Sequence, residues 1–342
     1  MPVVPARSRF LMLLLSLLFA CLALASRSAM AAVTLHYCVF DPLGTAGDYF
    51  TMARDYQLEA KRWGVDLVLD PYTNDSLAAE DFKAGQCDIT NMIGLRARLF
   101  NEFTGTLDAP GAIEDYAQMH TVLTLMSSPK LARFMTSGQF EVVGILPMGA
   151  TYNFVNDRQM NTIAKFTNKK IAVMGWDKVE SIMVEQFGAI PIACDTTSFA
   201  GKFNNGTVDI AIAPIVVYKP FELYKGMGTK GGIIRRPVGQ LSMQLVSRST
   251  KFPPDFGNQS REYIARQQDH AFGVVRNMEN EVEQHYWVYM NTAQHNEFYR
   301  IVRDGRAYLA KSGFYDKRML NILKRVRCGA DPTNSECSTG EE

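Results

Sequence analysis

The sequence lacks the motifs that identify common enzymes and metal proteins. It contains no Cys-x-x-Cys, no His-Glu-x-x-His and no Gly-x-Ser-x-Gly segment, and its five histidines show no i, i+4 pairing. A Gly-x-Gly-x-x-Gly match at 226–231 precedes a predicted strand instead of joining a strand to a helix, so the context of a dinucleotide site is missing. We therefore predict no metal, no cofactor and no catalytic residues.

The sequence also lacks an excess of basic or of acidic residues. The chain has 36 Lys and Arg against 35 Asp and Glu. Such a balance offers no basic surface for nucleic acid or for an anionic membrane. With 342 residues, 47% of them hydrophobic, the chain is long enough for more than one compact unit. We expect a monomer that binds no nucleic acid.

Long apolar runs are scarce, and the clearest lies at the N-terminus. Two arginines precede an uncharged apolar stretch at 10–25, and a small-x-small sequence ends at Ala31. This pattern is typical of a secretory signal, and the apolar run is short for a membrane span. We predict that residues 1–31 are removed on export to the periplasm. Lipidation of Cys21, whose surroundings resemble a lipoprotein box, is the less favoured alternative.

Cysteine is scarce as well. An odd number of cysteines follows the predicted signal, so at least one thiol is free or pairs with another chain. Cys328 and Cys337 bracket a turn-rich segment, and an oxidising compartment would allow a disulfide there. Cys38, Cys87 and Cys194 lie in strand-like runs and are predicted to be small buried hydrophobes.

Two stretches far apart in the sequence resemble each other: Phe82-Lys-Ala-Gly-Gln-Cys-Asp-Ile-Thr and Phe203-Asn-Asn-Gly-Thr-Val-Asp-Ile-Ala. Each glycine can end a helix with a positive φ, and the apolar residues around each aspartate suit a buried parallel strand. We predict two lobes of one α/β design, with a ligand site outside the carboxyl ends of their strands. The alternative is that the pattern marks only helix–strand turns.

Helix and strand signals alternate along the chain, which favours an α/β fold with parallel sheets. Strands are predicted at 34–40, 65–70, 88–93, 142–146, 170–174, 190–193, 208–213 and 241–246, and helices at 48–63 and 114–135. Pro253-Pro254 opens a segment to about 290 that is predicted to be one long helix, or two helices broken at Gly273. Segment 328–342 is predicted to be a loose polar tail.

The part of the chain between 166 and 214 resembles the second lobe of the DctP-like solute receptors of tripartite ATP-independent periplasmic (TRAP) transporters. That lobe carries a Gly-Ala-x-Pro turn, matched at 188–191, and a helix ending in Gly-x-Val-Asp, matched at 206–209. Residues 251–256 and the segment after them resemble the family's long interlobe helix. The chain is also similar to uncharacterised solute-binding proteins, some of them described as accessories of RND-type efflux pumps.

The resemblance implies a bilobal periplasmic-binding-protein fold with two parallel-dominated sheets, helices on both faces and a long interlobe helix. Lobe 1 is expected at 32–145 plus 241–272, and lobe 2 at 146–240 plus 273–327. The implied function is a receptor that closes around a small solute, such as an organic acid, and delivers it to the membrane subunits of a transporter. A receptor for another type of transporter is the runner-up in the same class. From a different class, the alternatives are a periplasmic accessory or adaptor of an efflux assembly and, less favoured, an enzyme on the same scaffold.

One departure from the family concerns the arginine that binds the ligand carboxylate. Ala172 stands at its place on the predicted strand, so either another cation binds an acid or the ligand is not a simple acid. Arg96 and Arg98 follow the third strand and are the nearest substitutes, because a guanidinium can bind a carboxylate bidentately. The alternative for both is a solvated helix start. The predicted ligand-binding residues are Asp41, Thr45, Asp48, Asn91, Arg96, Arg98, Met148, Tyr152, Trp176, Pro214 and Tyr218.

Overall fold

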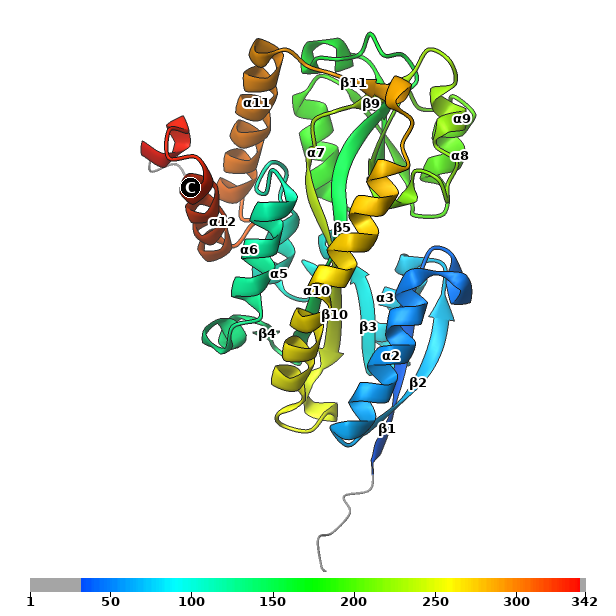
Figure 1. The fold of residues 1–342 in the computed structure, drawn as a ribbon, viewed down its shortest axis with the longest axis vertical. Helices are drawn as coiled ribbons and strands as arrows, with labels where there is room; N and C mark the ends of the chain where they lie inside the picture. Colours follow the sequence, from blue (N-terminus) through cyan, green and yellow to red (C-terminus); the bar gives the residue numbers. More distant parts are fainter. Residues whose placement is uncertain (1–31, 339–342) are drawn as a thin grey trace, which may run out of the picture.

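Two groups of parallel strands lie one beyond the other in the computed structural model (Figure 1). The structure describes residues 32–338, so the predicted signal and Cys21 lie outside the described residues. The first group holds β1 (Val33–Phe40), β2 (Val65–Tyr72) and β3 (Ile89–Ile93), and the second holds β6 (Lys170–Met174), β7 (Ile190–Cys194) and β8 (Ile210–Pro214). We call these groups, with the helices that join their strands, the first lobe and the second lobe.

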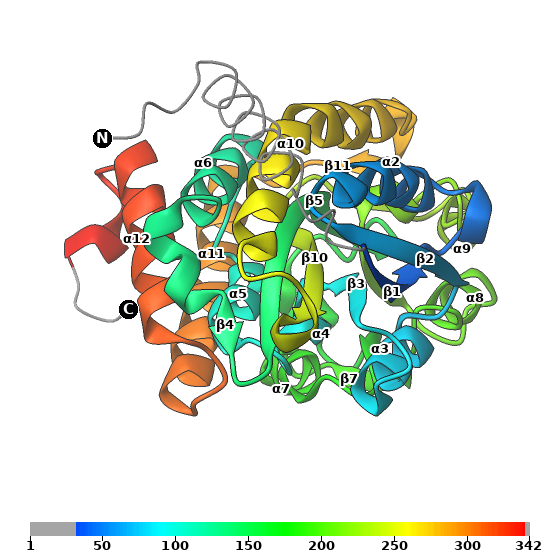
Figure 2. The same ribbon diagram turned by 90° about the horizontal axis from the view of Figure 1, so that it is seen from below.

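Helices cover both faces of the strands. The first lobe contains α2 (Asp48–Arg62), α3 (Asp75–Ala84), α4 (Gly94–Ala97) and α5 (Glu102–Gly105), and the second contains α7 (Lys178–Gln186), α8 (Phe199–Asn204) and α9 (Tyr224–Met227). Seen from below, α2 lies on one side of β1 and β2 and α3 lies on the other (Figure 2). The alternation of strand and helix confirms the predicted α/β class, and each predicted strand is present.

The two segments that resemble each other in sequence have the same structural role. The glycines of both have a positive φ, 83° and 77°. The Asp88 carboxylate accepts a hydrogen bond from His36 N at 2.9 Å, and Asp88 N donates to His36 O at 2.8 Å. Asp209 makes the same two bonds to Lys170, also at 2.9 and 2.8 Å. Each aspartate ties the entry of its own strand to the neighbouring parallel strand, which explains why the residue types recur.

Two long strands run through both lobes and join their sheets. β5 (Phe140–Val155) pairs with β10 (Gly239–Arg248) and, towards its end, with β8 and β9 (Gly232–Ile234). A strand of 16 residues is about 50 Å long, because each residue advances about 3.3 Å. The prediction of two parallel-dominated sheets is therefore corrected to one 11-stranded mixed sheet, antiparallel at its centre and parallel in the lobes; β4 (Thr136–Ser137) and β11 (Trp287–Val288) complete it.

A single helix, α10 (Phe256–Asn280), runs along both lobes beside β5 (Figure 1). Its 25 residues span about 37 Å at 1.5 Å per residue. Gly273 lies inside the helix, so the alternative of two shorter helices is excluded, and the helix ends before the predicted 290. The Ser260 hydroxyl anchors it to the sheet by donating to Val143 O at 2.7 Å.

Three further helices pack beside the lobes: α6 (Tyr116–Met126), α11 (Thr292–Lys311) and α12 (Lys317–Ala330) (Figures 1 and 2). The predicted disulfide between Cys328 and Cys337 is present. Arg327 donates to the two carboxylate oxygens of Glu336 at 2.6 and 2.9 Å, and both side chains are buried. The expectation of a loose tail is therefore wrong as far as residue 338, because a disulfide and a buried ion pair hold this part.

Cys38 and Cys87 are buried, as predicted, but they form a second disulfide and are not simple small hydrophobes. Cys38 lies in β1 and Cys87 lies just before β3, its parallel neighbour, so their Cα atoms are 5.8 Å apart. Cys194 is free and buried, as predicted. Within residues 32–338, no helix combines the length and the apolarity needed to cross a membrane.

Candidate functional site

A cavity of about 80 Å³ lies where the two lobes meet, and we call it the interlobe cavity. Leu95 of α4 lines it from the first lobe, and Ala172 of β6 and one face of α7 line it from the second. Thr151 of β5 and Gln240 of β10 bring in the two crossing strands. One water needs roughly 10–15 Å³ of such volume, so this cavity has room for a small molecule.

Two buried polar side chains on the cavity wall have no hydrogen-bond partner in the described part of the chain. Gln240 is 3% exposed, and neither its amide nitrogen nor its amide oxygen is bonded. Tyr315, in the connection between α11 and α12, is 2% exposed, and its hydroxyl is also unbonded. Buried polar groups are nearly always satisfied in native proteins, so unpaired groups around one cavity indicate a place for a polar ligand.

The two carboxyl groups on the wall have raised pKa values. Burial raises the pKa of Asp108 to about 7, although hydrogen bonds from the side chain and backbone of Ser242 oppose the shift. Burial, together with the nearby charge of Asp177, raises the pKa of Glu180 to about 8. A hydrogen bond from Met174 N and the charge of Arg98 oppose that shift. Both carboxyl groups therefore favour their neutral forms more than exposed carboxyl groups do.

Arg98 lies beside this cavity and spans the two lobes. Its Nη2 donates to Asp177 Oδ1 at 2.7 Å, and its guanidinium lies 5.6 Å from the centre of the Tyr315 ring. Arg98 Nη1 and Asp177 Oδ2 are buried without hydrogen-bond partners among the described residues. The structure thus places Arg98 beside the cavity but not on its wall, with Asp177 as its charge partner.

Arg96 lies in a second contact between the lobes. Its Nε donates to Asp75 Oδ2 at 2.6 Å and its Nη2 donates to Ser76 Oγ at 2.7 Å. Its guanidinium lies 3.9 Å from the centre of the Trp176 ring, in the second lobe. From that lobe too, the Thr196 hydroxyl donates to Asp75 Oδ1 at 2.9 Å. Arg96 and Trp176, both predicted to bind ligand, are therefore in contact with each other, and a ligand carboxylate would have to compete with Asp75 for Arg96.

Two other predicted residues make hydrogen bonds that shape the first lobe. The buried Asp41 carboxylate accepts from Leu43 N and Phe50 N, at 2.8 and 3.1 Å, and so fixes the turn between β1 and α2. The Asn91 side chain bonds to both backbone groups of Phe40, at 2.9 and 2.6 Å, and so joins β3 to β1. Neither side chain lines the interlobe cavity.

The two predicted tyrosines bond to glutamates at and just beyond the end of α10. Tyr152 donates to Glu279 Oε1 at 2.9 Å, and Tyr218 donates to a carboxylate oxygen of Glu283 at 2.5 Å. The first bond connects the second lobe to α10, and the second connects it to the segment that follows α10.

Three predicted residues lie away from the interlobe cavity. Thr45 is exposed in a turn, Met148 is buried in the core and Pro214 ends β8 opposite Thr151. Met148 and Pro214 are connected to the interlobe cavity only through the backbone of β5, whose Thr151 lines it.

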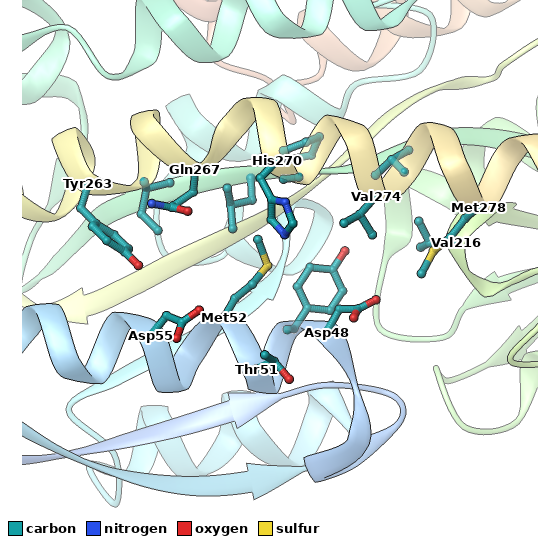
Figure 3. Close-up of a pocket in the computed structure, with 16 residues that line it drawn as sticks. Asp48, Thr51, Met52, Asp55, Val216, Tyr263, Gln267, His270, Val274 and Met278 are labelled. Carbon is teal, nitrogen blue, oxygen red and sulfur yellow. The ribbon is translucent and has the colours of Figure 1, made fainter.

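Asp48, the last predicted residue, lines a different cavity, the groove between α2 and α10 (Figure 3). Its volume is about 140 Å³. Figure 3 shows Met52 of α2 pointing towards Gln267 and His270 of α10 across it, and Thr51 and Tyr263 also line it. None of the predicted residues lines the interlobe cavity itself, and Asp48 alone among them lines the groove.

Sequence reasoning missed Gln240 and Tyr315. A signal for Gln240 exists, because Gln240, Ser242 and Gln244 alternate along β10 and all three are buried. A polar series of period two in an otherwise apolar strand indicates a polar face turned to the interior. No comparable signal marks Tyr315, which reaches the cavity only because α11 and α12 fold back onto α5 and α7.

A model of the family "Solute-binding protein AdeT 1/2" matches residues 60–342. The chain belongs to this family. "Probable solute-binding protein AdeT1" of Acinetobacter baumannii is 42% identical over 304 residues, covering 89% of this chain and 100% of that protein. "Probable solute-binding protein AdeT2" of the same organism is 23% identical over 233 residues, covering 68% of this chain and 98% of that protein. The family is one of solute-binding proteins and not of enzymes.

The fold is similar to that of TRAP periplasmic solute-binding proteins. One from Desulfovibrio salexigens, with bound orotic acid, has a TM-score of 0.69 and 15% identity, and the match covers 86% of this chain and 98% of that one. Another from Sulfurospirillum deleyianum, with bound succinate, has a TM-score of 0.66 and 12% identity, with 87% and 100% covered. The resemblance drawn from the sequence is confirmed; at these identities the likeness concerns the fold.

Proposed function

We propose that the chain is an exported receptor that closes its lobes around a small solute in the interlobe cavity and delivers the solute to an integral-membrane transporter. The observation that carries this proposal is the set of unbonded polar atoms of Gln240 and Tyr315 on a wall built from both lobes. The export signal predicted for residues 1–31 and the fold of TRAP periplasmic proteins support the periplasmic location.

Contacts between the lobes support closure around the solute. Arg98 of the first lobe bonds to Asp177 of the second, and Thr196 of the second bonds to Asp75 of the first. These polar contacts lie at the same boundary as the cavity and can be exchanged for water when the lobes separate. A solute that contacts both walls favours the closed state by its differential affinity for that state.

The crossing strands contain a suitable hinge. Leu241 pairs with Gly149 and Ser242 pairs with Pro147, so Met148 is an extra residue in β5. Gly149 has a φ of 98°, and Pro147 has no N–H to donate to the sheet. A bulge of this kind weakens the ladder locally, and a few residues that change φ and ψ are enough for domain closure.

Native mass spectrometry of the freshly purified mature protein tests the receptor function. We expect a small molecule to be retained, and small-angle scattering should show a smaller radius of gyration with that molecule than after its removal. A protein that retains nothing, keeps one radius of gyration and purifies stably with an efflux pump would be an adaptor instead.

A further inference from the structure

We infer that the interlobe cavity takes a small uncharged solute that both donates and accepts hydrogen bonds, and that it rejects carboxylates. The inference rests on the receptor function proposed above. It sets this chain apart from the structural relatives described with bound succinate and orotic acid. The charge of the cavity wall and the chemistry of its unbonded atoms carry the argument.

The cavity wall has acidic side chains and no basic one. Asp108 and Glu180 line it, and no Lys, Arg or His of the described chain does. The expected position of a carboxylate-binding cation is Ala172, whose methyl group adds only apolar surface. A ligand carboxylate would therefore lose its water without gaining a counter-charge, and it would approach two further carboxyl groups.

The nearby arginines do not reverse this charge. Arg96 is paired with Asp75, and that pair is almost fully buried. The Nη1 atom of Arg98 is buried without a hydrogen bond, but its Nη2 atom is paired with Asp177. The positive charge of Arg98 also acts on Asp108 and Glu180. One cation thus faces three acidic side chains, so the surroundings of the cavity give an anion no net attraction.

The unbonded groups of the wall fit an uncharged polar molecule. The Gln240 amide offers one group that donates and one that accepts, and the Tyr315 hydroxyl can do either. A solute amide, or a pair of hydroxyl groups, offers both a donor and an acceptor to such atoms. Near pH 7 the negative charge of these two side chains is only partial, because burial raises the pKa of Asp108 to about 7 and that of Glu180 to about 8, and Arg98 lies beside them, so the wall offers an organic cation no full counter-charge either.

Matched probes separate the three charge classes. Succinate, succinamide and putrescine have chains of similar length that end in carboxylates, amides and ammonium groups, and benzoate, benzamide and benzylamine form an aromatic set. Isothermal titration calorimetry on the solute-free mature protein should give at least tenfold tighter binding for the amide than for the carboxylate or the amine of the same set. Tighter binding of either charged member overturns the inference.

Two substitutions assign the preference to the cavity. Gln240→Leu and Tyr315→Phe should each weaken amide binding by about tenfold, the equivalent of about 1.4 kcal/mol. Without solute, neither variant should unfold at a lower temperature, because each loses only polar atoms that have no partner. Gln267→Leu, the same exchange in the groove between α2 and α10, is the control and should leave amide binding unchanged.

The remaining outcomes are also decisive. If the carboxylate binds tightly and the radius of gyration falls, the receptor function stands and the inference about charge fails. If Gln267→Leu loses amide binding and Gln240→Leu keeps it, the groove is the site and the inference fails. If no probe of either set binds, the inference fails as well, whereas the receptor function fails only if native mass spectrometry also finds no retained molecule.

Discussion

Replacing Arg96 by alanine should destabilise the protein even when no solute is present. The Arg96 side chain is 3% exposed, and that of its partner Asp75 is fully buried. The substitution removes the hydrogen bonds to Asp75 and Ser76 and the contact with the Trp176 ring. Asp75 would keep only the hydrogen bond from Thr196 and would become a buried carboxylate without a counter-charge.

The expected loss is about 3–5 kcal/mol, the usual result of removing one partner of a buried ion pair. Solvent screening reduces this figure little, because both side chains are buried. The loss is large beside the total stability of a typical domain, about 5–15 kcal/mol. A double variant, Asp75→Asn with Arg96→Met, should recover much of it, because no unpaired charge remains.

Urea unfolding of the solute-free protein, followed by circular dichroism, measures this loss. Arg266→Ala is a matched control, because Arg266 forms an exposed pair with Glu262 and its loss should change stability by less than about 1 kcal/mol. If Arg96→Ala is as stable as the parent, Arg96 is a cleft residue available to a ligand carboxylate, as its position in the sequence suggests, and the reasoning from its contacts is refuted.

Three shorter tests address other features. The free energy of unfolding should fall as the pH rises from about 4.5 to about 8, because folded Glu180 keeps a proton that the unfolded chain releases. In Glu180→Gln, the urea midpoint should depend less on pH between pH 5 and 9 than in the parent, and an equal dependence in both proteins would contradict this. Alkylation of the unfolded but unreduced mature protein should label Cys194 alone, and label on Cys38 or Cys87 would disprove their disulfide. N-terminal sequencing should begin at or near Ala32, whereas an intact start in the cytoplasm would contradict export.

Local patterns were sufficient to predict the elements of the fold. Each predicted strand is present because alternation and apolar runs reflect the side-chain period of a strand. The glycine and the aspartate of the segments 82–90 and 203–211 have the roles that their spacing indicates, a helix end and a strand entry. The resemblance drawn from 166–214 led to the correct family and fold.

Pairings between distant segments were not predictable from the same patterns. The single sheet results from β5 continuing from one lobe into the other, and no local signal separates one strand of 16 residues from a shorter one followed by a loop. The disulfide of Cys38 and Cys87 depends on the β1–β3 register. Asp75, the partner of Arg96, lies on a different helix, so its position became visible only in three dimensions.

The candidate site was predictable in outline only. Lobe boundaries and strand ends pointed to a site between the lobes, and Arg96, Arg98 and Trp176 do lie at that boundary. The side chains with unbonded atoms, Gln240 and Tyr315, come from a crossing strand and a connection between late helices. Their convergence depends on tertiary packing, which residue spacing does not encode.

Titration of the retained solute into the stripped mature protein, monitored by small-angle scattering, tests the central claim most directly. The account predicts that the radius of gyration falls on binding and that Gln240→Leu needs about tenfold more solute for the same change. An unchanged radius of gyration at saturation, or equal titration curves for the parent and Gln240→Leu, would contradict closure of the lobes around the interlobe cavity.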